Sequence, residues 1–258
     1  MSTQDLSKMG SARVSIETLG GANCVLKQGA SEVEIHFYQL AASKLKGINT
    51  PRLLKIDRNN LYIEHIPNRI SLKELRSNSD LFSQLAALHC SEYTPTFEVK
   101  KHEWTAFATD EALKILNLPD VVESSIQRIQ SRSDSIFEYK ALISGDTNDG
   151  NWGTRKNGDL VLFDWERFGQ GSPAIDLAPL VSGLGSIAEY REIVTQYIKY
   201  NSALSKTELL EHLIVAKCWI VIEVVNILNS RNNPEQEKYI NWYRANISNW
   251  LASVENAL

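Results

Sequence analysis

The chain has 258 residues, of which 43% are hydrophobic and 22% are charged, and its formal net charge is -4. This length and composition are ordinary for a soluble protein with a buried core, and they exclude an intrinsically disordered chain. The negative charge and the lack of any basic cluster argue against nucleic acid as a partner.

Other bulk features favour a cytoplasmic protein. The N-terminus has no basic segment followed by an apolar run, so we expect no secretory signal. Three cysteines, an odd number and far apart, are typical of reduced thiols and not of a disulfide framework. The longest apolar run, residues 213–228, contains Lys217 and Glu223 and is shorter than the roughly 20 residues that span a bilayer. We therefore expect a buried helix there and no membrane partner.

Short strands and tight turns are predicted at the N-terminal end. Residues 14–19 alternate between apolar and polar side chains, and Gly20 and Gly21 favour a turn. Residues 24–27 then form a second strand, which ends on Lys27.

A helix and a second hairpin are predicted between residues 31 and 67. Residues 31–45 place apolar side chains on one face, and Ser31 is suited to cap the helix that they form. Two acidic residues, Glu32 and Glu34, lie in the first turn of this helix. Residues 53–66 then read as two strands joined by a polar turn, and Pro67 ends the second strand.

Most of the remaining chain is helical by pattern. A capping box at Ser71 and Glu74 begins one helix, and residues 81–89 predict another. Further helices are predicted at residues 118–129, 186–200, 206–229 and 235–254.

The most informative stretch lies between residues 143 and 166. Asp146 and Asn151 stand five residues apart in a segment too rich in Gly, Asn and Asp for regular structure, and strand-like runs flank it. An Asn-Gly turn at residues 157–158 favours a hairpin that brings Asp164 back beside Asn151. Two carboxylates and an amide oxygen then converge, and this set suits Mg2+ together with a base that orients a hydroxyl.

At these residues the chain resembles the aminoglycoside phosphotransferase and choline kinase family, the small-molecule branch of the protein-kinase-like fold. Turn chemistry explains an Asp or an Asn, but not an ordered set of matches. One position departs from the family pattern, because Ser144 stands where the family usually has His, so that the hydrogen bonds of an imidazole must come from a hydroxyl or be lost. The matching residues, in order and at the family's spacing, are Gly145, Asp146, Gly150, Asn151, Asp164, Trp165, Glu166, Asp176, Leu177 and Ala178.

The resemblance implies an α+β, two-lobed protein-kinase-like fold. An N-lobe, residues 1–66, would hold a small antiparallel sheet and one helix. A mainly helical C-lobe, residues 67–258, would hold the catalytic loop, the metal site and the acceptor-binding helices. The resemblance is strong from Ser144 to Ala178 and loose over the rest of the chain.

The resemblance also implies transfer of the γ-phosphoryl of ATP or GTP to a hydroxyl of a small molecule. Asp146 would orient and deprotonate that hydroxyl, and Asn151 and Asp164 would hold Mg2+ ions that neutralise charge on the phosphates.

The same resemblance assigns the nucleotide contacts to the N-lobe. Lys27 would hold the α and β phosphates, and either Glu34 or Glu32 would position it. Ser11 lies in a loop that would cover the phosphates, although this loop is poor in glycine. The backbone from Glu64 to Ile66 would hydrogen-bond the adenine edge.

A site for the acceptor is predicted on the helix at residues 206–229. Trp219, Glu223 and Asn226 share one face of it, and an aromatic ring beside a carboxylate suits a cation. Aminoglycosides and choline are cationic, so we predict a cationic acceptor such as an aminoglycoside or other antibiotic. The alternative is a core helix in which Trp219 is buried and Glu223 pairs with a nearby Lys or Arg.

Other functions fit parts of the pattern. A choline, ethanolamine or thiamine-type metabolite kinase would use the same site. A nucleotide-binding pseudokinase would account for Ser144, but it predicts the loss of a metal ligand, and none is lost. A protein kinase would need an activation loop, for which the segment between Asp164 and Asp176 is short, and a metal hydrolase would need His clusters that the sequence lacks. We expect a monomer or a homodimer.

Overall fold

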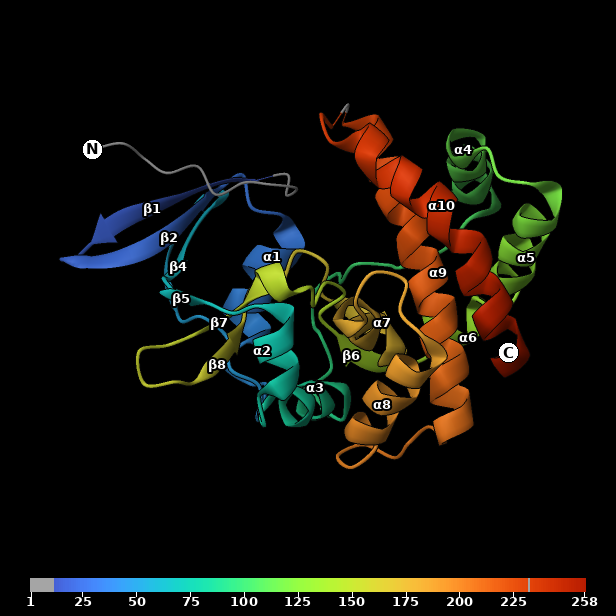
Figure 1. The fold of residues 1–258 in the computed structure, drawn as a ribbon. Coiled ribbons are helices and arrows are strands. Elements are labelled where there is room, and N and C mark those ends of the chain that lie inside the picture. Colours follow the sequence, from blue (N-terminus) through green and yellow to red (C-terminus); the bar gives the residue numbers. More distant parts are fainter. Residues whose placement is uncertain (1–11, 232) are drawn as a thin grey trace. The chain divides into compact units, whose positions relative to one another are not determined.

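The computed structural model describes residues 12–231 and 233–258. They form two compact units, the first made of residues 12–101 and 141–170 and the second of residues 102–140 and the described part of 171–258. Figure 1 shows that strands dominate the N-terminal part of the chain and helices its C-terminal part. The predicted α+β architecture is therefore confirmed, while the lobe boundary at residue 66 stays a prediction.

Four antiparallel strands form the main sheet of the first unit. Gly20 and Gly21, with φ of 58° and 82°, make the tight turn between the first two strands, because glycine adopts positive φ without steric cost. The pairing places Lys27 opposite Leu61 and Cys24 opposite Glu64. Across the sheet the order is β1 (Arg13–Leu19), β2 (Ala22–Gln28), β4 (Asn60–Glu64) and β3 (Leu53–Asp57), which confirms the predicted strands.

The helix that follows β2 changes its bonding pattern halfway. α1 (Glu32–His36) begins at Ser31, whose hydroxyl accepts the Glu34 amide at 3.2 Å, as predicted. The helix predicted to reach residue 45 instead continues as the π-helix η1 (Phe37–Ala41). π-Helical turns occur frequently at functional sites.

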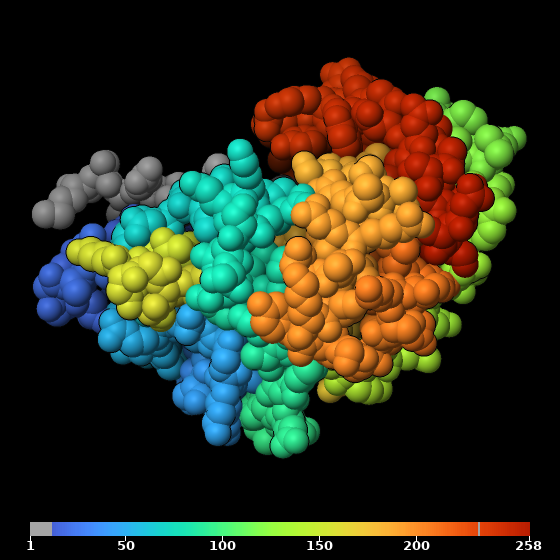
Figure 2. All heavy atoms as spheres, turned by 60° about the horizontal axis from the view of Figure 1, so that its bottom comes forward, coloured from blue at the N-terminus to red at the C-terminus, as the bar shows by residue number. Residues whose placement is uncertain are grey.

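A second, small sheet carries the catalytic loop suggested by the sequence. It consists of β5 (Asn68–Arg69), β7 (Trp152–Thr154) and β8 (Leu160–Leu162), and β7 follows the short helix η2 (Asp149–Asn151). Gly158, with φ of 94°, lies in the turn of the β7–β8 hairpin. The yellow atoms of this hairpin lie against cyan atoms of the chain around β5 and α2 (Figure 2).

The remaining elements of the first unit support this sheet. α2 (Leu72–Ser77) begins with the predicted capping box of Ser71 and Glu74. α3 (Leu81–His89) follows it, and its Gln84 amide donates to the Leu160 carbonyl of β8 at 3.1 Å. β6 (Ala141–Ile143) pairs with β9 (Gly169–Gly171).

The second unit is helical and is built around α9 (Lys206–Ser230), which contacts most of the other helices. α9 is long and apolar enough to span a membrane by composition, but 61% of its most apolar window is buried inside the fold, as in a core helix. The other helices of this unit are α4 (Ala106–Leu116), α5 (Asp120–Gln130), α6 (Asp134–Phe137), α7 (Ala174–Leu177), η3 (Ala178–Leu180), α8 (Ile187–Tyr197), α10 (Gln236–Val254) and η4 (Glu255–Ala257).

Candidate active site

A buried lysine joins two carboxylates in the first unit. Lys27, near the end of β2, places Nζ 2.7 Å from Oε1 and 2.6 Å from Oε2 of Glu34. The same Nζ lies 2.8 Å from Oδ1 of Asp164, which follows β8. Glu34 is fully buried and Lys27 is 6% exposed. The structure thus pairs Lys27 with Glu34, and not with Glu32, and adds Asp164 as a second partner.

The charges of this group keep the lysine protonated. Burial disfavours the ammonium, but the Glu34 and Asp164 carboxylates outweigh burial and raise the pKa of Lys27. Burial also raises the pKa of Glu34 to about 7, against the opposing charge of Lys27. Lys27 is therefore a fixed cation, held in place by two carboxylates.

Asp164 has a strained backbone that aims its carboxylate at Lys27. Its φ of 68° lies in the left-handed region, which costs a residue other than glycine on the order of 1 kcal/mol. The next residue, Trp165, holds this geometry. Its amide donates to Glu34 at 3.2 Å, and its ring stacks on Phe37 with centroids 4.0 Å apart. Such strain persists only where the surroundings over-determine it, as at functional sites.

The loop after β6 folds around Asp146. The side-chain amide of Asn148 donates to Oδ1 of Asp146 at 2.6 Å, and the side-chain amide of Asn151 donates to the backbone carbonyl of Asp146 at 3.0 Å. The backbone carbonyl of Asn151 in turn accepts a hydrogen bond from the backbone amide of Phe163 at 3.0 Å. Because Phe163 precedes Asp164, the hairpin brings Asn151 next to Asp164, as the sequence predicted.

The electrostatic environment of Asp146 suits a base. Burial raises the pKa of the Asp146 carboxyl and the charge of Asp164 adds to this, although Asn148 and Arg167 oppose them. A carboxylate whose pKa is shifted towards neutrality is a better proton acceptor at physiological pH than an ordinary one.

Glu166 is a fourth carboxylate at the site, after Glu34, Asp146 and Asp164, and the sequence pattern predicted no role for it. Burial raises its pKa, and the nearby charges of Asp164 and Asp146 raise it further, while Lys27 and Arg167 oppose them. Its match to the family pattern was the signal that could have marked it.

The residues predicted to bind metal fit Mg2+. Oδ1 of Asp164 accepts a hydrogen bond from Lys27, while Oδ2 forms no hydrogen bond within the described residues. The Asp164 side chain is 30% exposed. The side-chain nitrogen of Asn151 donates to the Asp146 carbonyl, and Asn151 Oδ1 forms no hydrogen bond within the described residues, so this oxygen is also available to a metal ion. No group of three His, Cys, Asp or Glu that could hold a metal occurs in the described part of the chain. Two protein oxygens suit Mg2+, because this ion keeps several waters and binds substrate phosphates.

The expected base-binding segment has free backbone groups. Within residues 12–231 and 233–258, the backbone groups of His65 and Ile66 form no hydrogen bond, and both residues are half-buried. The Glu64 side chain forms an ion pair with Arg155.

Two further predicted positions are serines. Ser11 lies outside the described residues, and Ser144 is fully buried directly after β6.

The three predicted acceptor residues lie on α9 in the second unit. Trp219 is 2% exposed, and its ring contacts Phe137 and His102 edge to face, with centroids 5.1 Å and 5.9 Å apart. The Asn226 amide donates to the Ala108 carbonyl at 2.8 Å, and Glu223 is half-buried. Trp219 and Asn226 thus have packing partners, as in the core-helix alternative, and the acceptor role of the three residues stays a prediction.

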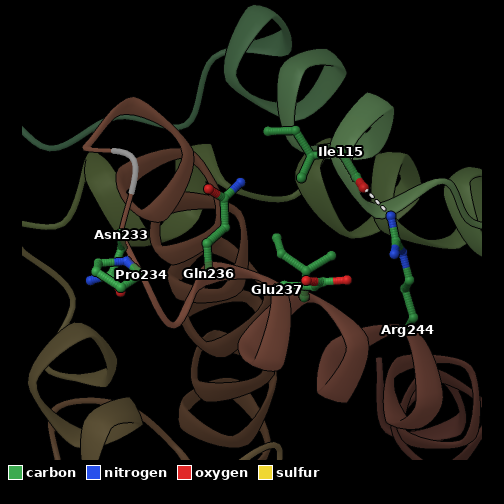
Figure 3. A pocket seen from close by; sticks show the side chains of 7 residues that line it. Ile115, Asn233, Pro234, Gln236, Glu237 and Arg244 are labelled. Carbon is green, nitrogen blue, oxygen red and sulfur yellow. Dashed lines mark hydrogen bonds between the residues drawn. The ribbon is translucent and has the colours of Figure 1, made fainter.

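A surface pocket of the second unit lies between α4 and the N-terminal half of α10 (Figure 3). Among the described residues that line it, the basic one is Arg244, which donates to the carbonyls of Ile115 and Leu116 at 2.7 Å and 2.8 Å. These carbonyls belong to the last turn of α4, so Arg244 caps that helix and is not available to an anion.

Comparison with known proteins supports the fold. No protein-family model and no curated protein matches the chain. Among solved structures, the choline kinase LicA from Streptococcus pneumoniae is similar over 98% of this chain and 94% of its own, with a TM-score of 0.67 and 16% identity. A choline/ethanolamine kinase family protein from Mesorhizobium loti is similar over 99% of this chain and 90% of its own, with a TM-score of 0.66 and 15% identity. The aminoglycoside phosphotransferase APH(4)-Ia is similar over 98% of this chain and 93% of its own, with a TM-score of 0.61 and 14% identity. The chain has the fold of these enzymes, which confirms the predicted resemblance at the level of fold.

Proposed function

We propose that this chain, which has the fold of aminoglycoside phosphotransferases and choline kinases, transfers the γ-phosphoryl of ATP or GTP to a hydroxyl of a small molecule. The observation that carries the proposal is the group formed by Lys27, Glu34 and Asp164, next to the loop of Asp146 and Asn151. Fold alone does not fix function, but these residue types in this arrangement serve phosphoryl transfer.

Asp146 is the proposed base. Its carboxylate orients the acceptor hydroxyl and takes its proton as the oxygen attacks the γ-phosphorus. Asn148, which donates to Oδ1, fixes the carboxyl rotamer and leaves Oδ2 for the acceptor. The raised pKa of Asp146 fits this role, because a base is most effective when its pKa approaches the working pH.

The phosphates are held by fixed positive charge. Lys27, positioned by Glu34, pairs with the α and β phosphates. Asn151 and Asp164 would hold Mg2+, which supplies charge neutralisation on the phosphate oxygens when it is bound. The free backbone groups of His65 and Ile66 would meet the edge of the base. A structure of LicA, at 15% identity, was solved in complex with AMP, which supports a nucleotide of this kind.

We further propose a cationic acceptor. The structures with the same fold include both an aminoglycoside phosphotransferase and choline/ethanolamine kinases. Antibiotics and amino-alcohol metabolites are thus both candidate substrates, and a cytoplasmic location would suit either.

Nucleotide turnover with a panel of hydroxyl compounds tests the proposal. Purified protein with Mg-ATP or Mg-GTP should release ADP or GDP faster when an aminoglycoside, choline or ethanolamine is added. Asp146→Ala is the control, since it should abolish the stimulation. A protein that binds neither nucleotide would refute the proposal.

A further inference from the structure

A half-buried ion pair links the end of β4 to the β7–β8 hairpin. Nε and Nη2 of Arg155 each lie 3.0 Å from one oxygen of Glu64, so the guanidinium holds the carboxylate with two parallel bonds. Nη2 also donates to the Thr50 carbonyl at 2.9 Å. The Glu64 and Arg155 side chains are 14% and 23% exposed. Two-bond pairs of this kind are directional and are the strong members of their class.

The chain after Glu64 is bound to the same hairpin. β5 pairs with β7, and the Asn68 side chain donates to the Thr154 carbonyl at 3.2 Å. The approach is so close that a Cβ on Gly153 would lie 2.7 Å from the Asn68 carbonyl and 2.9 Å from Ile66. The segment from Glu64 to Asn68 is therefore anchored at both ends to β7–β8.

The anchored segment contains the free backbone groups described above. His65 and Ile66 lie between Glu64 and Asn68, and their amides and carbonyls form no hydrogen bond within the described residues. The hairpin that anchors them begins directly after Asn151 and ends at Leu162, shortly before Asp164. The β7–β8 hairpin thus connects the backbone groups proposed to bind the base with the side chains proposed to hold the metal.

We propose that Arg155 is a positioning residue for the nucleotide, which fixes the base-binding backbone of His65 and Ile66 relative to the hairpin between Asn151 and Asp164. Arg155 itself touches no substrate in this role. The inference rests on the proposed function, and it adds a residue that determines how tightly the base, as opposed to the phosphates, is held.

The test compares a ligand that has a base with one that lacks it. Calorimetry would measure the affinity of wild type and Arg155→Gln for Mg-ATP and for Mg-tripolyphosphate. We expect Arg155→Gln to bind Mg-ATP about tenfold more weakly, since small displacements of positioning groups carry large costs, while tripolyphosphate affinity is unchanged. Arg155→Lys, which keeps the charge but not the two-bond geometry, should show a smaller loss of the same kind.

The chain offers a matched control. Arg52 also pairs with Glu64, at 3.4 Å, but its side chain is 77% exposed and it lies outside the hairpin. Arg52→Gln removes the same charge and should leave both affinities unchanged. Equal losses for ATP and tripolyphosphate in Arg155→Gln, or no loss for either, would overturn the inference. If Arg155→Gln does not fold, Arg155→Lys decides by the same criterion. A wild type that does not bind Mg-ATP would refute the proposed function itself, which is a different result.

Discussion

Lys217 should make the protein more stable as the pH rises above 8. This lysine of α9 is 6% exposed, and its Nζ donates to the carbonyls of Ala178 and Val181 at 3.0 Å and 2.9 Å. Burial lowers its pKa from 10.5 to about 8, and the charge of Glu189 opposes this only in part. Two carbonyls satisfy the ammonium as hydrogen-bond acceptors but supply no full negative charge.

The sign and size of the effect follow from proton linkage. Below pH 8 the folded and unfolded states both bind the proton, and the folded state bears the full cost of the buried charge. Between pH 8 and 10.5 only the unfolded state binds it, so the free energy of unfolding increases with pH. Above pH 10.5 the contribution no longer changes. The shift corresponds to about 3 kcal/mol, since one pKa unit is worth about 1.4 kcal/mol.

Lys217→Met isolates this effect. Urea unfolding, followed by tryptophan fluorescence from pH 6.5 to 10.5, gives the stability of the variant relative to wild type. The packing that the variant loses is independent of pH, and the change of Lys217 on deprotonation is contained in its pKa shift, so the relative stability of the variant should fall by about 3 kcal/mol over this range. Lys206→Met, at the exposed start of the same helix, is the control, and its stability relative to wild type should not change with pH over this range. A flat difference for Lys217→Met would refute the reasoning.

Three further substitutions test the site. Asp164→Asn should lower both nucleotide affinity and turnover, because a weakened metal ligand weakens the whole phosphate clamp, and an unchanged Mg2+ dependence would exclude Asp164 as a ligand. If the Ser144 hydroxyl replaces a hydrogen bond of the family's histidine, Ser144→Ala should cost about 0.5 to 1.5 kcal/mol of order in the site, whereas complete inactivity would show a chemical role for the hydroxyl. Glu223→Gln should raise KM for a cationic acceptor and not for a neutral one, and an equal effect on both would assign Glu223 to the core.

The local parts of the site could be predicted from the sequence. The Asn157–Gly158 turn determines the β7–β8 hairpin, and the hairpin determines that Asn151 and Asp164 meet. Ser31 caps α1 and so fixes which face of the helix carries Glu34. These features depend on residues close together in the chain, and local pattern is informative about them.

The remaining features depend on tertiary contacts. The π-helix at Phe37–Ala41 lies where Phe37 stacks on Trp165, far away in the chain. Arg155 and Glu64 are separated by 91 positions, and neither carries a local signal of the other. β5 has two residues, too few to show periodicity. α9 is apolar on nearly all sides, so periodicity could not decide whether Trp219 faces the core or a ligand.

The most direct test of the account is the separation of binding from transfer at Asp146. Asp146→Ala and the isosteric Asp146→Asn should bind Mg-nucleotide with affinity close to that of wild type, because Lys27, Asn151 and Asp164 hold the phosphates and the metal. Transfer to the acceptor should be abolished in both variants, since neither retains a base. Calorimetry on the nucleotide and turnover with a stimulating acceptor measure the two quantities on the same protein. A loss of nucleotide affinity as large as the loss of turnover, or turnover that survives in Asp146→Asn, would contradict the account.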